Sequence, residues 1–110
     1  MGMVGVPRFS VWRVDLNPTR GSEQSGHRPV LVVSPDEMNA NLNTVIVAPL
    51  TTRLRGWPTR VRVEHDGKTG EVALDQLRAI DKSRLGRGLG HLHAAHRAPV
   101  LNVLAAMFAE

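Results

Sequence analysis

The sequence predicts a small curled sheet or β-barrel of short antiparallel strands, with one short helix after the second strand and another helix at the C-terminus. Apolar or alternating runs recur along the chain and are separated by Pro, Gly and Asn, which is the pattern of an antiparallel β protein. Asp66-Gly67 lies between two such runs and is a strong hairpin-turn signal. From about Ala98 the apolar residues change to helical spacing.

The first strand is predicted from Phe9 to Leu16, where the side chains alternate in polarity. The second runs from Pro29 to Ser34 and is apolar on both faces, which indicates a central position in the sheet. Residues 34–37 are typical of a helix start, with Ser34 as the cap and a proline at the first helical position. We expect this helix to be short because the asparagine-rich residues 39–43 favour turns.

The third strand is predicted from Thr44 to Leu50, an apolar run that indicates burial. Residues 60–64 alternate strictly, so the two valines are expected to face the core while Arg60 and Arg62 face solvent.

Residues 71–74 and 76–80 complete the predicted strands, and the glycine-rich run 86–90 is interpreted as a connector. The apolar positions of the C-terminal helix are Val100, Leu101, Leu104, Met107 and Phe108. The sequence contains no internal repeat and no domain boundary, so we expect residues 1–110 to form one domain.

Composition limits the chemistry of the chain. Its 110 residues include no cysteine, which excludes disulfides, thiolate catalysis and cysteine-bound zinc. No apolar run approaches the roughly 18 residues of a membrane span, and the N-terminus lacks a signal pattern, so we expect a soluble, cytoplasmic protein. Lys and Arg total 14 against 10 Asp and Glu, and nearly all of these cations are arginine, whose planar guanidinium suits phosphate. The net charge of +4 permits nucleic-acid binding without establishing it.

The most informative stretch runs from Asp15 to Ser34, where a polar loop leads into the predicted central strand. Proline and glycine interrupt this loop, and it gathers side chains that exchange protons or neutralise anions, namely Glu23, Gln24, His27 and Arg28. A polar loop fixed to a rigid strand is where binding and catalytic residues concentrate. This loop is therefore the predicted functional centre.

Several motifs follow one another in chain order. The longest spans Val14 to Pro29, and the later ones are Ser34-Pro35, Pro49-Leu50-Thr51-Thr52, Gly56-Trp57-Pro58, and Leu74-Asp75-Gln76 with Arg78 and Asp81. Together they resemble the MazF family of bacterial toxins over nearly the whole chain. An ordered set of this length is far more specific than a single short motif.

The resemblance implies an SH3-like barrel, of the type shared with the CcdB toxin, that works as a homodimer. It also implies a sequence-specific endoribonuclease toxin of a MazE/MazF-type toxin–antitoxin system. Such a toxin cuts single-stranded RNA, including mRNA, without a metal or another cofactor, and thereby inhibits translation and growth. Cleavage in that family leaves a 2′,3′-cyclic phosphate and a 5′-hydroxyl, and a MazE-like antitoxin with an acidic, flexible tail occupies the RNA groove.

Metal-free RNA cleavage needs a base for the 2′-hydroxyl, an acid for the departing 5′-oxygen and a group that stabilises negative charge on phosphorus. Arg28 is the predicted charge stabiliser, because it lies where the loop enters a central strand and matches a catalytic position of the family. Thr51 matches the family's catalytic threonine and would orient the phosphate through its hydroxyl. Glu23 is the provisional general base, and His27 is an alternative for acid–base chemistry. The structural alternatives are an Arg28 ion pair with Asp15 or Glu23, and a turn capped by Thr51.

Further side chains are predicted to contact RNA. They are Gln24, His27, Thr52, Arg53, Arg55, Trp57 and Gln76. Arginines would meet phosphates and an exposed Trp57 would stack on a base; the alternative is that Trp57 packs against Pro58 or the dimer partner. The spacing of His91, His93 and His96 does not match the usual zinc pairing, and no metal site is predicted.

Two other functions are compatible with such a fold. A CcdB-like toxin binds DNA gyrase without catalysis, but that resemblance depends on a tryptophan near the C-terminus, where this chain has Ala106-Met107-Phe108-Ala109-Glu110. A barrel that has lost catalysis and binds an acidic peptide through its arginines is the third interpretation. The set of Glu23, Arg28 and Thr51 favours the nuclease.

Overall fold

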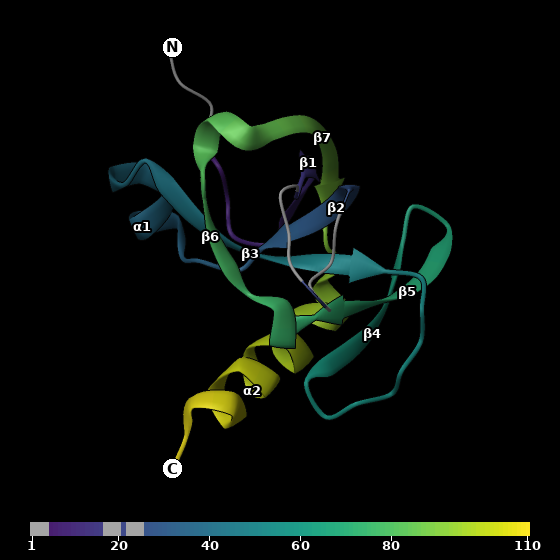
Figure 1. The fold of residues 1–110 in the computed structure, drawn as a ribbon. Coiled ribbons are helices and arrows are strands. Elements are labelled where there is room, and N and C mark those ends of the chain that lie inside the picture. Colours follow the sequence, from purple (N-terminus) through teal and green to yellow (C-terminus); the bar gives the residue numbers. More distant parts are fainter. Residues whose placement is uncertain (1–4, 17–20, 22–25) are drawn as a thin grey trace.

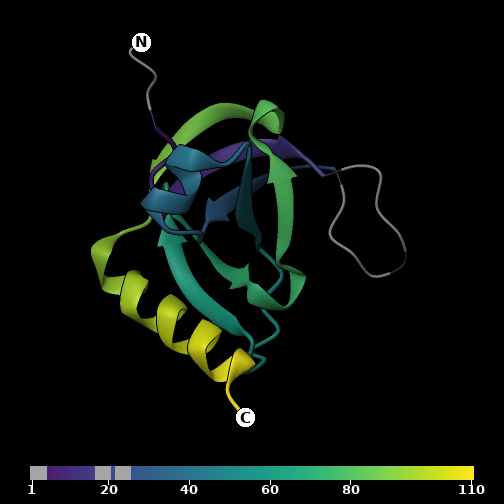
Figure 2. The ribbon, with the colours of Figure 1, turned by 90° about the vertical axis from the view of Figure 1, so that its left-hand side faces the viewer.

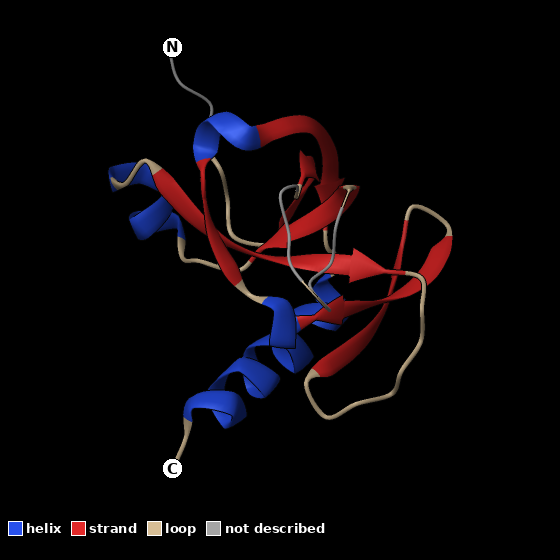
Figure 3. Ribbon diagram, viewed as in Figure 1, coloured by secondary structure: helices blue, strands red, loops and turns tan. Residues whose placement is uncertain are grey.

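The computed structural model describes residues 5–16, 21 and 26–110 of the chain. Its strands and α-helices follow in the order β1 (Ser10–Asp15), β2 (His27–Val32), α1 (Asp36–Asn41), β3 (Thr44–Thr51), β4 (Arg60–His65), β5 (Lys68–Ala73), β6 (Arg78–Asp81), β7 (Leu85–His91) and α2 (Arg97–Phe108). Short 3-10 helices occupy Leu74–Gln76, Lys82–Arg84 and Ala94–His96. The strands form one curled antiparallel sheet in the order β4-β5-β3-β2-β1-β7, with β6 beside β3 (Figures 1 and 3). The predicted fold class is confirmed, including the short helix after the second strand.

β3 is the strand at which the sheet bends. β2 runs along one edge of β3, and β6 runs along the other edge over residues 44–47. Farther along β3, β5 takes the place of β6, so that Leu50 pairs with Val72 and Thr51 with Glu71. β3 therefore joins the β4–β5 hairpin to the rest of the sheet (Figure 1).

Two hydrophobic clusters cover opposite faces of the central strands. One extends to α2 and includes Leu31, Leu50 and Val100. The other includes Val30 and Val47. Alternate side chains of one strand face different clusters, as the two-residue period of a strand requires. The predicted burial of the second strand on both faces is therefore confirmed.

α2 lies along one side of the curled sheet (Figure 2). The side chains that it packs against the core are Val100, Val103, Leu104 and Met107. Leu101 and Phe108 belong to the predicted apolar set of this helix, but Phe108 is 74% exposed and Leu101 is exposed as well. The helix is apolar around most of its circumference, so spacing alone could not identify the stripe that faces the core.

Ser34 does not cap α1, contrary to the prediction. The helix begins at Asp36, and its N-cap residue Pro35 provides no side-chain hydrogen bond. The buried Ser34 hydroxyl instead donates to Asn39 Oδ1 at 2.5 Å and accepts from the backbone N–H of Ile46 at 3.0 Å. These bonds satisfy a buried polar group and tie the short helix to β3.

The glycine-rich run that was interpreted as a connector belongs to β7. A Cβ atom on Gly86 would stand 2.8 Å from the carbonyl oxygen of Arg13, so a side chain would not fit beside β1. Glycine thereby permits β7 to pair with β1 through an irregular register. The prediction was wrong because glycine is uncommon in strands and a close backbone approach is not visible in a sequence.

The hairpin prediction is confirmed. Asp66 and Gly67 have φ angles of +54° and +74°, as both central residues of a type I′ turn require, and they join β4 to β5. No helix in the described part of the chain has the length and apolar character needed to cross a membrane.

Candidate active site

A cavity of about 500 Å³ opens where β2 begins, β3 ends and the β4–β5 hairpin turns. Its polar and charged lining consists of Arg13, His27, Arg28, Thr51, Thr52, His65, Asp66, Lys68 and Thr69. This lining contains two arginines and a lysine but only one carboxylate, so its positive charge favours the binding of anions.

The pairing of β2 with β3 explains why Arg28 and Thr51 line one cavity. The last pair of the β2–β3 register is Val30 with Pro49, and Arg28 and Thr51 each lie two residues beyond it, at the end that borders the cavity. Paired residues project to the same face and residues two apart on a strand share a face, so Arg28 and Thr51 leave their strands on the same side. Arg28 pairs with Val14 of β1, which fixes its backbone against that strand.

Thr51 is held tightly at the end of β3. It is 6% exposed, and its Oγ1 accepts a hydrogen bond from the backbone N–H of Arg53 at 3.1 Å. The structural role of Thr51 in a turn is therefore present, yet the hydroxyl proton can still be donated to a ligand. The Thr51 carbonyl lies against Gly70 of β5, where a Cβ atom would stand only 2.7 Å from the carbonyl oxygen.

His27 lies beside Arg28 at the cavity. Its side chain is 64% exposed, and its Nε2 is 4.0 Å from Asp15 Oδ2. An exposed pair at this distance contributes little to stability. Glu23 and Gln24, the other predicted site residues of this loop, lie outside the described residues.

The segment between β3 and β4, residues 52–59, carries most of the predicted RNA-contacting residues, and these side chains are exposed. Trp57 is 46% exposed, and its ring lies near two guanidinium groups, those of Arg55 at 5.3 Å and Arg60 at 4.7 Å from the ring centre. Trp57 is thus held by cation–π contacts with arginines, which leave part of the ring facing solvent.

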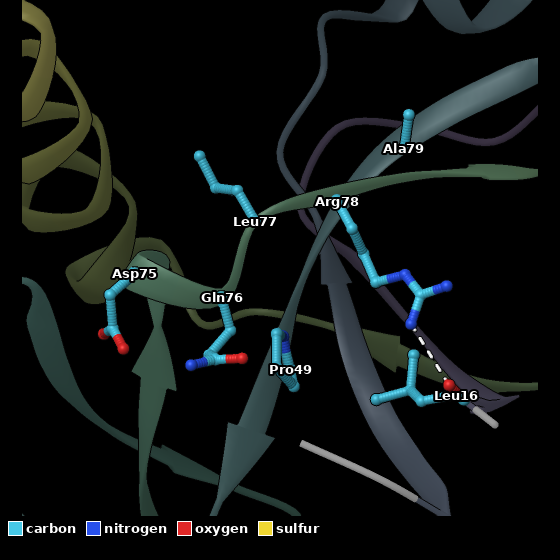
Figure 4. A pocket seen from close by; sticks show the side chains of 7 residues that line it. All are labelled: Leu16, Pro49, Asp75, Gln76, Leu77, Arg78 and Ala79. Atoms are coloured by element: carbon cyan, nitrogen blue, oxygen red, sulfur yellow. Dashed lines mark hydrogen bonds between the residues drawn. The ribbon is translucent and has the colours of Figure 1, made fainter. Parts of the chain in front are cut away.

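Gln76 lies apart from the Arg28 cavity. It lines a second hollow of about 490 Å³ together with Leu16, Pro49, Asp75 and Arg78 (Figure 4). Arg78 reaches across this hollow, where its Nη1 donates to the Leu16 carbonyl oxygen at 3.1 Å. Of the predicted RNA-contacting residues, His27 and Thr52 line the Arg28 cavity and Gln76 lines the second hollow. The two hollows are neighbours, since Pro49 lines one and Leu50 the other.

Three charged residues form an ion-paired group that the sequence analysis did not predict, and we call it the Arg60 cluster: Arg60, Glu71 and Asp75. The Arg60 and Glu71 side chains are only 4% and 2% exposed. Arg60 Nε and Nη2 donate to the two Asp75 carboxylate oxygens at 2.7 and 3.2 Å, and Nη1 lies 3.5 Å from Glu71 Oε1. The prediction that Arg60 faces solvent is therefore wrong, because alternation cannot reveal acidic partners on β5 and in the 3-10 helix that follows it.

The hydrogen bonds of the Arg60 cluster set its protonation. Burial raises the pKa of Glu71, but the backbone N–H groups of Arg55 and Gly56, together with the Arg60 guanidinium, hold that pKa below its ordinary value of 4.5. Burial also raises the pKa of Asp75, and hydrogen bonds, first of all from Arg60, bring it below the ordinary 3.8. The hydrogen bond with Asp75 raises the pKa of Arg60. All three side chains are therefore charged at neutral pH.

His93 and His96 each accept a hydrogen bond from a backbone N–H group. His93 Nδ1 accepts from the backbone N–H of Ala95 at 3.1 Å, and His96 Nε2 accepts from that of Glu64 at 3.2 Å. Within residues 5–16 and 26–110, no three His, Asp or Glu side chains converge as a set of metal ligands.

Comparison with known proteins relates both the sequence and the fold to one group. Residues 7–108 match the family model described as "PemK-like, MazF-like toxin of type II toxin-antitoxin system". The chain is 37% identical over 103 residues to "Endoribonuclease MazF" of Staphylococcus saprophyticus, covering 88% of this chain and 86% of that protein. The crystal structure of MazF from Deinococcus radiodurans superposes with a TM-score of 0.82 at 29% identity, over 96% of this chain and 97% of that one. A mycobacterial endoribonuclease in complex with its cognate antitoxin superposes with a TM-score of 0.79 at 30% identity, over 92% of each chain.

Proposed function

The chain belongs to the family of PemK-like, MazF-like toxins of type II toxin–antitoxin systems, and on this basis we propose that it is a sequence-specific endoribonuclease toxin that cleaves single-stranded RNA. The similar protein of Staphylococcus saprophyticus is an endoribonuclease, and the mycobacterial one binds a cognate antitoxin. The observation that carries the proposal is the presence of Arg28 and Thr51 in one cationic cavity.

The proposed reaction uses the 2′-hydroxyl of the substrate as the nucleophile. A base removes its proton, the 2′-oxygen bonds to phosphorus, the bond from phosphorus to the 5′-oxygen breaks, and an acid protonates that oxygen. The products are a 2′,3′-cyclic phosphate and a 5′-hydroxyl. DNA is not a substrate because it lacks the 2′-hydroxyl.

Arg28 and Thr51 have distinct roles in this proposal. The Arg28 guanidinium stabilises the charge that develops on the phosphate oxygens, because it projects from an anchored position into the cavity. The Thr51 hydroxyl donates to a phosphate oxygen and orients the group for attack. Glu23 is the proposed base and His27 the alternative, and the chemistry requires no metal.

The RNA strand and the antitoxin are proposed to use the same cationic surface. Arg53 and Arg55 meet phosphates, Trp57 stacks on a base, and Gln24, Thr52 and Gln76 supply further contacts. A MazE-like antitoxin would present an acidic segment to these arginines. We further propose that the chain acts as one domain, in a cytoplasmic homodimer.

The proposal is tested by incubating a long mixed-sequence RNA with the protein in excess EDTA and mapping the ends. Wild type should cut at one short motif and leave 5′-hydroxyl ends, and Arg28→Ala and Thr51→Ala should each abolish the cuts. Arg87→Ala is the matched control, because Arg87 is an exposed arginine of β7 that does not line the cavity. A folded wild type that cuts no RNA, or cuts only with added metal, would refute the proposal, and binding to DNA gyrase would then be assayed.

A further inference from the structure

The buried carboxylate of Glu71 has no part in the proposed mechanism, yet it is directed at the segment that carries the RNA-contacting residues. Its Oε1 accepts from the backbone N–H of Arg55 at 3.0 Å, and its Oε2 accepts from that of Gly56 at 2.8 Å. Both carboxylate oxygens are thus used to hold two consecutive residues of an exposed segment. Gly56 has a φ of +68°, a conformation that favours glycine and forms part of this turn.

The segment needs such an anchor because it has no regular secondary structure between β3 and β4 (Figure 3). Its first part is tied by the Arg53 N–H bond to Thr51 Oγ1, and its last part by the Arg60 N–H bond to the Trp57 carbonyl at 2.9 Å. Glu71 anchors the middle of the segment through the backbone N–H groups of Arg55 and Gly56. An irregular segment with anchors at both ends and at its centre presents its side chains in one arrangement at a lower entropic cost of binding.

The rest of the Arg60 cluster supports the same segment. The Arg60 guanidinium pairs with both carboxylates and lies 4.7 Å from the Trp57 ring centre. Asp75 Oδ1 accepts from the hydroxyl of Thr59, at the end of the segment, at 3.0 Å. The backbone of Glu71 also pairs with Thr51 of β3, so one residue connects residues 52–59 to the cavity.

We propose that Glu71 is a positioning residue that fixes residues 52–59 in the arrangement that reads the RNA sequence, an inference that rests on the proposed function. Glu71 does not touch the reacting atoms. It acts through the backbone of Arg55 and Gly56, and through Arg60 on Trp57. Losing this anchor lets the segment adopt other arrangements, and apparent affinity falls in proportion to the fraction that remains competent to bind.

The test compares Glu71→Gln with wild type and with Glu64→Gln, a matched change at an exposed position of β4. Glu71→Gln should speed amide hydrogen exchange at Arg55 and Gly56 by at least about tenfold, because the amide keeps one acceptor oxygen and turns an N–H donor toward the other backbone N–H group. It should raise KM for RNA that carries the mapped motif by about tenfold and reduce discrimination against single-base variants of that motif, with a smaller change in kcat. Glu64→Gln should change none of these quantities.

Gly56→Ala provides a second variant that leaves the Arg60 cluster intact. A Cβ atom at Gly56 meets nothing within 4 Å, so the change acts only through the positive φ of the segment. Gly56→Ala should lose discrimination against single-base variants of the motif while its urea midpoint stays unchanged. It can therefore test the inference even if Glu71→Gln does not fold. Unchanged amide exchange and unchanged motif discrimination in the folded variants would overturn the inference while wild-type cleavage stands. A wild type that cuts no RNA would refute the proposed function, and the recognition role of Glu71 with it.

Discussion

Replacing Arg60 by methionine is expected to destabilise the fold by about 3 kcal/mol. Removing one partner of a buried ion pair costs about 3–5 kcal/mol, because the remaining charge is left uncompensated. The Arg60 and Glu71 side chains are 4% and 2% exposed, so solvent screens this pair only weakly. The lower end of the range applies because Glu71 keeps two backbone donors and Asp75, which is 24% exposed, can be rehydrated.

Urea unfolding at a fixed protein concentration measures this cost. With an m-value of about 2 kcal/mol/M, the midpoint should fall by roughly 1.5 M. Arg62→Met, at an exposed position on the same strand, is the control and should stay within about 0.5 kcal/mol of wild type. A loss below about 1 kcal/mol for Arg60→Met would refute the view that the cluster is a desolvated structural unit. Adding Glu71→Gln should recover part of the loss, because it removes the uncompensated charge.

Three further predictions concern catalysis, acid stability and packing. Arg28→Ala should lower kcat/KM for RNA by about 100-fold or more with an unchanged urea midpoint; a comparable loss in Arg87→Ala would contradict a specific role. The lowered pKa values of Glu71 and Asp75 predict that their contribution to stability is complete above about pH 4.5 and is lost as the pH falls through the folded-state values, because the unfolded chain then binds more protons. Urea midpoints measured between about pH 7 and about pH 3 test this. In Glu71→Gln the free energy of unfolding should fall less over this pH range than it does in wild type. Gly70→Ala should lower Tm by an amount equivalent to about 1–3 kcal/mol and reduce activity, since its Cβ would stand 2.7 Å from the Thr51 carbonyl oxygen; an unchanged Tm would mean that the backbone yields freely.

Most of the strands and helices could be predicted from patterns of neighbouring residues. The Asp66-Gly67 turn and the apolar run in β3 are encoded by neighbouring residues, so a sequence pattern identifies them. Ser34 and Gly86 were misjudged because their roles depend on atoms of distant strands. The face of α2 that packs on the core also could not be predicted, because it is determined by contacts with the sheet.

Some residues of the candidate site could be predicted from the sequence and others could not. Arg28 and Thr51 were identified from a family resemblance, while their shared cavity follows from the β2–β3 register, which a single sequence does not reveal. The Arg60 cluster was missed because its members come from β4, β5 and the 3-10 helix after β5. One signal was available: Glu71 directly precedes the apolar residues Val72-Ala73-Leu74, and a charge at the margin of a buried run needs a partner.

The most direct test of the central claim uses an oligonucleotide that carries the mapped motif, either as all RNA or with a single 2′-deoxy nucleotide at the cut site. Both are incubated with wild-type protein in excess EDTA, and binding is measured alongside cleavage. If the 2′-hydroxyl attacks phosphorus in the Arg28 cavity, the all-RNA substrate is cut to a 2′,3′-cyclic phosphate, while the 2′-deoxy substrate binds and remains intact. Cleavage of the bound 2′-deoxy substrate at the same bond would contradict the account, because another nucleophile would then be responsible.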